Sequence, residues 1–337
     1  MASFRNAHTE FVDFSLLPFR QGAFPVRLRE IKGDWYVMSS SVTGLEPADK
    51  IEQVNGRDAA TFFSDYLPYV AASRPEYRGY SLFSKLNGLP SKITLAKECG
   101  TLFELDRSAN HLDRNDTVSS TEFSDHALIR IPSFDDPKFE EDAVEAVRRF
   151  GGKRYIVIDV RGNGGGDTPR NLIDAVMDRP HPGWIESSSS RTGLEIAETF
   201  PRHEGKSTVN RTPRSTITWS TGWHQPSETA YSGKLVIFVD VGCKSATEDF
   251  LLPLVATQRA LVIGETTAGS SGQPYVESPY DEMLFTVGAK RQFFPDMTPL
   301  EGRGIRPDIE VDPLKALRGG IDFYLKIARE EMHTEGG

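Results

Sequence analysis

The stretch Tyr155-Ile156-Val157-Ile158-Asp159-Val160, followed directly by Arg161-Gly162-Asn163-Gly164-Gly165-Gly166-Asp167, decides the fold class. A run of this kind, without alternation of apolar and polar residues, is typical of a strand that is buried on both faces. The sequence predicts further apolar strands at 127–131, 235–241 and 260–263 and helices at 139–150, 172–177 and about 246–258. Alternating strands and helices predict an α/β domain with a partly parallel sheet.

A second region precedes this domain. Short β-type runs separated by turn residues indicate a β-rich domain over 20–106, with one helix near Ala59–Val70 and a tight turn at Asn55-Gly56. The expected strands include Phe24–Val26, Trp35–Met38, Lys50–Val54, Lys92–Ala96 and Thr101–Leu105. The Ser/Arg/Thr-rich stretch 186–232 has little periodicity, so we expect a long excursion with poorly specified structure. The predicted organisation is a segment 1–19, the β-rich domain 20–106, a polar connector 107–122, the α/β domain 123–325 and a tail 326–337.

Composition narrows the function classes. The 337 residues are 38% hydrophobic and 26% charged, which is ordinary for a globular protein and excludes a fibrous or disordered chain. The net charge of −9 provides no basic footprint, so we expect no nucleic-acid partner. No apolar run approaches the roughly 20 residues of a membrane helix, so we expect no membrane span.

The cysteines and the N-terminus bear on cofactors and compartment. Cys99 and Cys243 are too few for a disulfide scaffold and lack metal-ligand spacing, and we expect neither a metal nor an organic cofactor. Residues 1–10 contain no apolar segment of the kind that a signal peptide needs. The sequence as written therefore predicts a cytoplasmic protein, and a secreted or periplasmic one if an upstream segment is missing.

The glycine-rich run 159–167 allows three interpretations. It is an ordinary strand-to-helix turn, or a phosphate-binding loop, or an oxyanion hole built from backbone N–H groups. The run lacks the Lys-Ser/Thr of a P-loop and the spacing of a dinucleotide-binding motif, which argues against the second interpretation.

The segment Gly242–Glu248 is the second candidate cluster. Ser245 falls where a strand gives way to a helix, a position that suits a nucleophile with a free neighbouring N–H and equally suits an ordinary N-cap. Cys243 is a rival nucleophile, because helix N-termini and a nearby Lys244 lower thiol pKa values. Lys244 itself is a conceivable base, although adjacent side chains usually point apart.

Two more loops and the histidines complete the candidates. Loops 263–274 and 299–311 each combine glycines with a carboxylate, and each is also consistent with a plain surface loop. Histidine is the usual general base near neutral pH, but patterning does not choose among the seven, at positions 8, 111, 126, 181, 203, 224 and 333.

In this order, the four clusters resemble the tail-specific, or C-terminal processing, peptidase family. Tyr155–Asp167 resembles its strand with an Asp-x-Arg-x-Asn-x-Gly-Gly signature, and Gly242–Glu248 its Gly-Ser-Ala-Ser-Ala-Ser-Glu segment. Gly264–Gly269 is similar to its Gly-Glu-x-Thr-x-Gly loop, and Gly304–Val311 to its closing Gly-x-x-Pro-Asp-x-x-Val. In the first domain, 44–56 resembles the Gly-Leu-x-x-Gly-Asp…Val-Asn-Gly of a PDZ module, with Ala48 at a position often held by glycine.

The resemblance implies a serine nucleophile at Ser245. In the Ser-Lys branch of the family a lysine follows the nucleophile by 25 positions, but that position is Ser270 here. The branch that includes the tricorn proteases is a better match. Asn6-Ala7-His8-Thr9-Glu10 is similar to the segment that carries its histidine base, and Glu301 is similar to the carboxylate that supports that histidine.

The resemblance also implies a fold and a chemistry. We expect a crotonase-like ββα-type protease domain with a mixed sheet at 123–325, preceded by a PDZ-like domain. Ser245 would attack the peptide carbonyl, His8 would carry its proton, and the N–H groups of Ala246 and of Gly164 or Gly165 would form the oxyanion hole. The expected partner is a peptide or protein substrate held by its C-terminus. The sequence leaves the oligomeric state open.

Two alternatives remain beside a serine peptidase. The same fold could act on a small non-peptide carbonyl substrate as a hydrolase or acyl-transfer enzyme, or it could bind peptides or other ligands without catalysis. Labelling of Ser245 by a fluorophosphonate separates both enzymes from a binding protein, and peptide cleavage separates the two enzymes.

Overall fold

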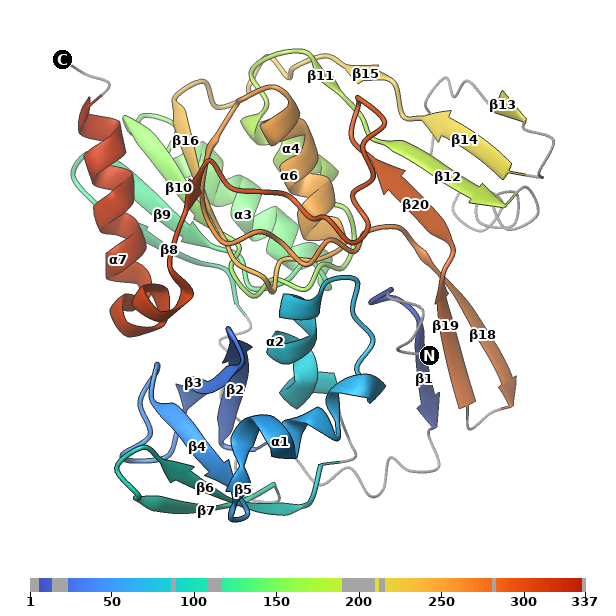
Figure 1. The fold of residues 1–337 in the computed structure, drawn as a ribbon. Coiled ribbons are helices and arrows are strands. Elements are labelled where there is room, and N and C mark those ends of the chain that lie inside the picture. The colour runs from blue at the N-terminus through green and yellow to red at the C-terminus, as the bar shows by residue number, and fades with distance from the viewer. Residues whose placement is uncertain are drawn as a thin grey trace. The chain divides into compact units, whose positions relative to one another are not determined.

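The computed structural model describes residues 6–13, 24–85, 89–107, 117–189, 210–211, 216–280 and 283–334 (Figure 1). Contacts divide the chain into two compact units. Unit 1 comprises Met1–Arg114, Val276–Phe285 and Val311–Gly337, and unit 2 comprises Asn115–Tyr275 and Thr286–Glu310. Each unit has its own core of buried apolar side chains.

A six-stranded mixed sheet forms the centre of unit 2. Its order is β21-β17-β16-β10-β9-β8. Strands β9, β10, β16, β17 and β21 run parallel, and β8 pairs antiparallel with β9. The bounds are β8 (Ser119–Glu122), β9 (His126–Arg130), β10 (Tyr155–Asp159), β16 (Lys234–Val239), β17 (Leu261–Gly264) and β21 (Ile309–Glu310). The predicted α/β class with a mixed, partly parallel sheet is therefore confirmed.

Three helices pack on this sheet: α3 (Pro137–Arg149), α4 (Arg170–Val176) and α6 (Ala246–Ala256). Asp136 caps α3 by accepting the Lys138 N–H, and Pro137 occupies the first turn, where its missing N–H costs nothing. All five residues of β10 are buried, and Ile156 and Ile158 join the apolar helix faces in the core. In Figure 1 the three helices lie together beside the strands of this sheet. The three helices predicted for this region are confirmed, with ends shifted by a few residues.

The prediction for 186–232 is wrong for the described part of that stretch. A four-stranded sheet of order β13-β14-β12-β20 includes much of it, and β11 pairs with β15. The bounds are β11 (His181–Pro182), β12 (Ile185–Ser189), β13 (Asn210–Arg211), β14 (Thr216–Ser220), β15 (Trp223–His224) and β20 (Lys290–Phe293). β12 pairs with β20, whose residues lie about a hundred positions later in the chain, with Ile185 opposite Phe293. Pairing with such a distant strand leaves no local periodic signal, which is why the sequence pattern missed it.

Unit 1 contains an antiparallel sheet of order β2-β3-β4-β6-β7, with β5 paired to β4. The bounds are β2 (Val26–Ile31), β3 (Asp34–Ser40), β4 (Lys50–Val54), β5 (Arg57–Asp58), β6 (Lys92–Lys97) and β7 (Leu102–Asp106). The expected turn at Asn55-Gly56 is present, and both residues have positive φ. The expected β-rich character of this region is confirmed, while its PDZ-like identity stays a prediction.

The helices of unit 1 differ from expectation. The predicted helix over 59–70 ends early, as α1 (Ala59–Ser64), and a separate 3-10 turn, η3 (Leu67–Tyr69), follows it. Pro68 explains the break, because it has no N–H group to donate to the carbonyl of Ser64, so the α-helical hydrogen-bond pattern cannot continue through it. Helix α2 (Pro75–Lys85), which packs on β2, was not predicted. It contains Gly79, a poor helix former, at a position where an added Cβ would lie 2.5 Å from Cβ of Glu30.

The remaining described elements are a three-stranded sheet, β1-β19-β18, and the C-terminal helix. Their bounds are β1 (Glu10–Asp13), β18 (Pro274–Tyr280), β19 (Met283–Gly288) and α7 (Pro313–Thr334). Helix α7 is kinked at Gly320, whose φ of 52° and ψ of −141° are not helical. Among the helices that the structure describes, none has the length and apolar character that crossing a membrane would require.

Candidate active site

Three loops of unit 2 leave the same edge of the central sheet. They follow β10 (160–167), β16 (240–245) and β17 (265–273), and these strands are parallel neighbours, so their carboxyl ends coincide. Backbone hydrogen bonds join the loops. The Lys244 N–H donates to the Asn163 carbonyl at 3.2 Å, and the Ser245 N–H donates to the Ser270 carbonyl at 2.9 Å. Ser245 is therefore held between the glycine-rich loop and the loop after β17.

Ser245 has a strained backbone. Its φ of 58° and ψ of −123° lie outside the regions that non-glycine residues prefer, at the N-cap of α6. Its side chain makes no capping hydrogen bond, so the ordinary N-cap interpretation is not supported. Strain of this kind is often found at functional sites, and a sharp strand-to-helix turn is the known way to present a nucleophilic serine.

The start of α6 offers one open N–H group. The N–H groups of Thr247, Glu248 and Asp249 donate to the carbonyls of Lys244 or Ser245. The Ala246 N–H has no acceptor among the described residues. An N–H at the first turn, beside Ser245, is suited to stabilise negative charge.

The glycine-rich loop approaches this point very closely. A Cβ added at Gly165 would lie 2.8 Å from the Ser245 Cβ and 2.9 Å from the Ala246 nitrogen, and φ of Gly165 is +98°. The Gly165 N–H itself donates to Oδ1 of Asn163 at 2.9 Å. The Gly164 N–H has no acceptor within the described part of the chain. Of the two glycines named in the sequence prediction, the geometry thus favours Gly164 as an oxyanion donor.

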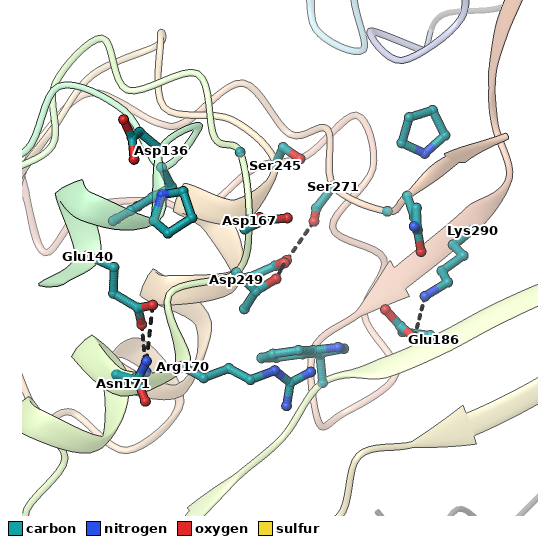
Figure 2. A pocket seen from close by; sticks show the side chains of 18 residues that line it. Asp136, Glu140, Asp167, Arg170, Asn171, Glu186, Ser245, Asp249, Ser271 and Lys290 are labelled. Carbon is teal, nitrogen blue, oxygen red and sulfur yellow. Dashed lines mark hydrogen bonds and ion pairs between the residues drawn. The ribbon is translucent and has the colours of Figure 1, made fainter. Parts of the chain in front are cut away.

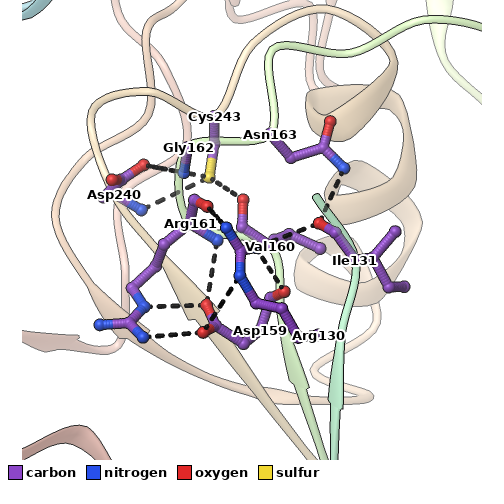
Figure 3. Close-up of polar contacts among 9 residues, drawn as sticks. All are labelled: Arg130, Ile131, Asp159, Val160, Arg161, Gly162, Asn163, Asp240 and Cys243. Carbon is purple, nitrogen blue, oxygen red and sulfur yellow. Dashed lines mark hydrogen bonds and ion pairs between the residues drawn. The ribbon is translucent and has the colours of Figure 1, made fainter. Parts of the chain in front are cut away.

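A buried ion pair fixes the base of the glycine-rich loop (Figure 3). Arg161 donates to Asp159 through Nε at 2.8 Å and through a second guanidinium nitrogen at 2.7 Å. Arg130 adds hydrogen bonds to the carbonyls of Asp159, at 3.0 Å, and Arg161, at 2.6 Å. Burial alone would raise the pKa of Asp159, but the two guanidinium groups outweigh it and hold that pKa below its usual value.

Cys243 is unsuited to act as a nucleophile. Its side chain is fully buried, and the thiol donates to the Val160 carbonyl at 3.1 Å (Figure 3). Burial and the nearby charge of Asp240 raise the pKa of this thiol well above its normal value, so the reactive thiolate is disfavoured. The alternative of a cysteine nucleophile is therefore not supported.

Glu248 holds the loop after β17 against the start of α6. Its fully buried carboxylate accepts the N–H groups of Gly269 at 2.8 Å and Ser270 at 2.9 Å, and it contacts the Thr267 hydroxyl. Burial raises the pKa of Glu248 to about 7, although these three donors oppose the effect. Ser270, the position of the lysine in the other branch, thus lies beside the backbone of Ser245, but it cannot serve as that base.

The loop that carries Glu301 is tied to the same segment. The Gly302 N–H donates to the Gly269 carbonyl at 2.7 Å, and Leu300 is fully buried in the core of unit 2. Gly269 and Ser270 are consecutive, so one short segment bonds to the backbone beside both Glu301 and Ser245. The loop of Ser245 and the loop of Glu301 are therefore both bonded to the segment 269–270. The sequence did not indicate this connection, because the two residues are far apart in the chain.

His8 belongs to unit 1, where a turn holds it. Its N–H donates to Oδ1 of Asn6 at 3.0 Å, and the Ala7 N–H donates to the Ser73 hydroxyl at 3.0 Å. His8 is only 9% exposed. This turn gives the histidine a defined place within unit 1.

The histidines that the structure describes in unit 2 are poorly suited to act as the general base for Ser245. His126 pairs with Tyr155 at the amino ends of β9 and β10, opposite the edge that carries Ser245. His181 and His224 stack on each other with ring centroids 5.1 Å apart, and burial lowers the pKa of His181. No histidine described in unit 2 lines the cavity that contains Ser245.

That cavity has a volume of about 1000 Å³ (Figure 2). Ser245 lies in its wall, and so do Asp249 and Ser271, which are joined by a hydrogen bond of 2.7 Å. The apolar part of the wall includes Phe134 and Trp184. Among the described residues no cluster of His, Cys, Asp or Glu has the arrangement of a metal site.

Sequence reasoning missed two of the polar groups at this site. Asp249 lines the cavity, and Thr247 contacts Oδ1 of Asn163 at 2.8 Å. One signal was available for Asp249, because it lies in the first turn of the helix that was predicted to start directly after Ser245. No sequence signal links Thr247 to Asn163, since their contact joins two loops that are 84 positions apart.

These features define a class of enzyme. A strained serine at a strand-to-helix turn, with open backbone N–H groups beside it, is the arrangement of serine-type hydrolases. The sequence profile of peptidase family S41 matches residues 125–311, which is more than half of the chain. The chain therefore belongs to peptidase family S41 and is a serine-type peptidase, as the sequence motifs predicted.

Solved structures agree with this fold. Mature CPAF complexed with lactacystin is similar with a TM-score of 0.70 and 14% identity, over 97% of this chain and 85% of that one. The photosystem II D1 C-terminal processing protease is similar with a TM-score of 0.51 and 17% identity, over 93% of this chain and 79% of that one. No curated protein matches the sequence.

Proposed function

We propose that the chain hydrolyses peptide bonds through an acyl-enzyme, with Ser245 as nucleophile, His8 as general base and Glu301 as the group that orients the histidine. The N–H groups of Ala246 and Gly164 would bind the oxyanion. The substrate would be a peptide or protein, and the PDZ-like region of unit 1 would hold its C-terminus by adding it to a sheet edge. No metal or organic cofactor has a part in this scheme.

The observation that supports this proposal best is the conformation of Ser245. A φ of 58° on a non-glycine residue is costly, by about 1–3 kcal/mol, and here it coincides with a side chain that makes no capping hydrogen bond. A serine at an ordinary helix start would need neither a positive φ nor a side chain without a capping hydrogen bond. The strain is accounted for if the hydroxyl has to face the cavity beside the open N–H of Ala246.

The steps follow from these roles. His8 takes the hydroxyl proton of Ser245 while its oxygen bonds to the carbonyl carbon, and the N–H groups of Ala246 and Gly164 stabilise the oxygen that becomes negative. His8 then gives the proton to the leaving nitrogen as the C–N bond breaks. A water molecule repeats the sequence on the ester and releases the acid. Loss of one oxyanion donor usually costs about 10² to 10³ in rate.

Fluorophosphonate labelling of the intact protein tests the proposal. We expect wild type to be labelled on Ser245, and Ser245→Ala and His8→Ala to lose labelling. Cys243→Ala is the matched control for a rival nucleophile, and His333→Ala, at an exposed position of α7, is the control for the histidine; both should be labelled normally.

Each outcome has a consequence. Labelling that survives in Ser245→Ala refutes the nucleophile assignment. A loss of less than about tenfold in His8→Ala refutes the base assignment, because removing a member of a triad can cost up to about 10⁶ in rate. Labelling without cleavage of any peptide in a diverse library would favour a small carbonyl substrate instead.

A further inference from the structure

The cavity beside Ser245 has an unbalanced charge. Five carboxylates line it and only two cations: Asp136, Glu140, Asp167, Glu186 and Asp249 against Arg170 and Lys290. The two cations already have partners, Glu186 for Lys290 and the ring of Trp184 for Arg170. The wall therefore keeps a surplus of negative charge facing the space that a substrate would fill (Figure 2).

Both cations contact other side chains of the cavity wall. Lys290 forms a buried ion pair with Glu186 at 3.2 Å, and both residues are 5% exposed. The Arg170 guanidinium lies over the ring of Trp184, 5.6 Å from its centre. The ion pair of Lys290 and Glu186 is internally neutral, so the uncompensated charge belongs to the other carboxylates.

Asp249 is the carboxylate best placed to meet a substrate. It accepts hydrogen bonds from Thr168 and Ser271 at 2.7 Å and from Gln292 at 2.8 Å. All three donors are neutral, so they orient the carboxylate without pairing its charge. Burial raises the pKa of Asp249, and the three hydrogen bonds oppose this rise. A cationic side chain beside the carboxylate would favour its charged form. A carboxylate offers about four acceptor positions, which leaves one for a ligand.

The distance from the nucleophile suits a long side chain. Ser245 precedes the first residue of α6, Asp249 lies in its first turn, and both residues line the same cavity. The long side chain of a lysine, with its four-carbon stem, or of an arginine suits a carboxylate that lies one helical turn beyond the nucleophile in the same cavity. The apolar wall at Phe134 would contact the methylene groups of such a stem.

We infer that this cavity selects peptides with a lysine or arginine on the acyl side of the scissile bond, and that Asp249 is the principal specificity-determining residue, with Asp167 contributing. The inference rests on the proposed function of Ser245. Asp167 supports it because its exposed carboxylate has no hydrogen bond or ion pair to any residue that the structure describes, and it lines the same cavity.

The test compares quenched fluorescent peptides that differ only in the residue before the cleaved bond: Lys, Met or Glu. We expect kcat/KM for Lys to exceed that for Met by about tenfold to a hundredfold, because a hydrogen bond to a charged group is worth more than a neutral one. Glu should be cleaved slowest. Asp249→Asn should abolish the Lys preference, and Asp167→Asn should reduce it by about threefold, where the preference is the ratio of kcat/KM for Lys to kcat/KM for Met in the same variant.

Asp174→Asn is the matched control, because it removes an exposed carboxylate of α4 that does not line the cavity. It should keep the wild-type preference. If Asp249→Asn does not fold, as judged by circular dichroism, Asp167→Asn still tests the inference. Equal cleavage of the Lys and Met peptides by wild type overturns it, and so does a preference that survives in both cavity variants.

A binding measurement separates this inference from the proposed mechanism. Fluorescence anisotropy of a labelled peptide that ends in Lys, or in Met, is recorded with Ser245→Ala, which needs no bond cleavage. Tighter binding of the Lys peptide without cleavage by wild type would refute the proposed function and leave standing only the preference of the cavity for a basic side chain. Cleavage without any preference would refute the inference and leave the function standing.

Discussion

The buried carboxylate of Glu248 gives the sharpest prediction about stability. It accepts two backbone N–H groups from the segment 269–270, and burial raises its pKa from 4.5 to about 7. The folded protein therefore holds this proton more tightly than the unfolded chain. The stability that protonation supplies is complete below about pH 4.5 and is lost as the pH rises to about 7.

The size of the effect follows from that pKa. The interval from 4.5 to about 7, at about 1.4 kcal/mol for each pH unit, corresponds to about 3 kcal/mol of unfolding free energy. Glu248→Gln cannot ionise. It also leaves one N–H group without its oxygen, which should cost about 1–3 kcal/mol, but this cost does not depend on pH.

The assay is urea unfolding of wild type and Glu248→Gln at several pH values between 4.5 and 8. Trp184, Trp219 and Trp223 belong to unit 2 and report its unfolding by fluorescence. We expect the stability of wild type relative to Glu248→Gln to fall by about 3 kcal/mol across this range. Glu145→Gln, which alters an exposed residue of α3, is the control and should differ from wild type by a constant amount.

A stability difference between wild type and Glu248→Gln that does not change with pH would refute this reasoning. It would mean that the three hydrogen-bond donors outweigh burial and keep the carboxylate ionised throughout. A difference that grows in the opposite direction, with wild type gaining stability as the pH rises, would refute it as well.

Three further predictions concern the loops around Ser245. Gly165→Ala should slow fluorophosphonate labelling by at least about tenfold, because the new Cβ would lie within 3 Å of the Ser245 Cβ and the Ala246 nitrogen. Gly152→Ala is the control and should label normally, because its new Cβ would meet no atom within 4 Å. Asp159→Asn should lower the unfolding free energy by about 1–3 kcal/mol at neutral pH, as measured in urea, because it removes the charged acceptor of two hydrogen bonds from Arg161. Since the pKa of Asp159 is depressed, the difference from wild type should shrink as the pH falls below about 3.8, and no loss at pH 7 would contradict the assignment. The thiol of Cys243 should resist iodoacetamide in the folded protein and react in urea, as detected by mass spectrometry; rapid reaction of the native protein would contradict its burial.

Much of the fold could be predicted from local pattern. The run 155–160 has no polar alternation because its strand is buried on both faces, and all five residues of β10 are indeed buried. The turn at Asn55-Gly56 follows from the φ values that these residues tolerate. The strands within 186–232 were missed because Ser- and Thr-rich strands paired with a distant segment carry no periodic apolar signal.

The sequence by itself determined the family and the identity of the chemical groups. Ser245, the glycines after β10 and the absence of a lysine at position 270 are facts of the order of residues, and they sufficed to predict a serine peptidase. These facts are local, because a motif records which atoms must be present at fixed spacing along one segment.

Only the tertiary structure decided how those groups can act. It gave Ser245 its positive φ, committed the Gly165 N–H to Asn163, buried Cys243, and placed Asp249 in the wall of the cavity. Each of these outcomes depends on contacts between loops that are far apart in the chain but emerge from neighbouring parallel strands. Accessibility, pKa and hydrogen-bond partners are properties of that packing, and no single segment of the sequence contains them.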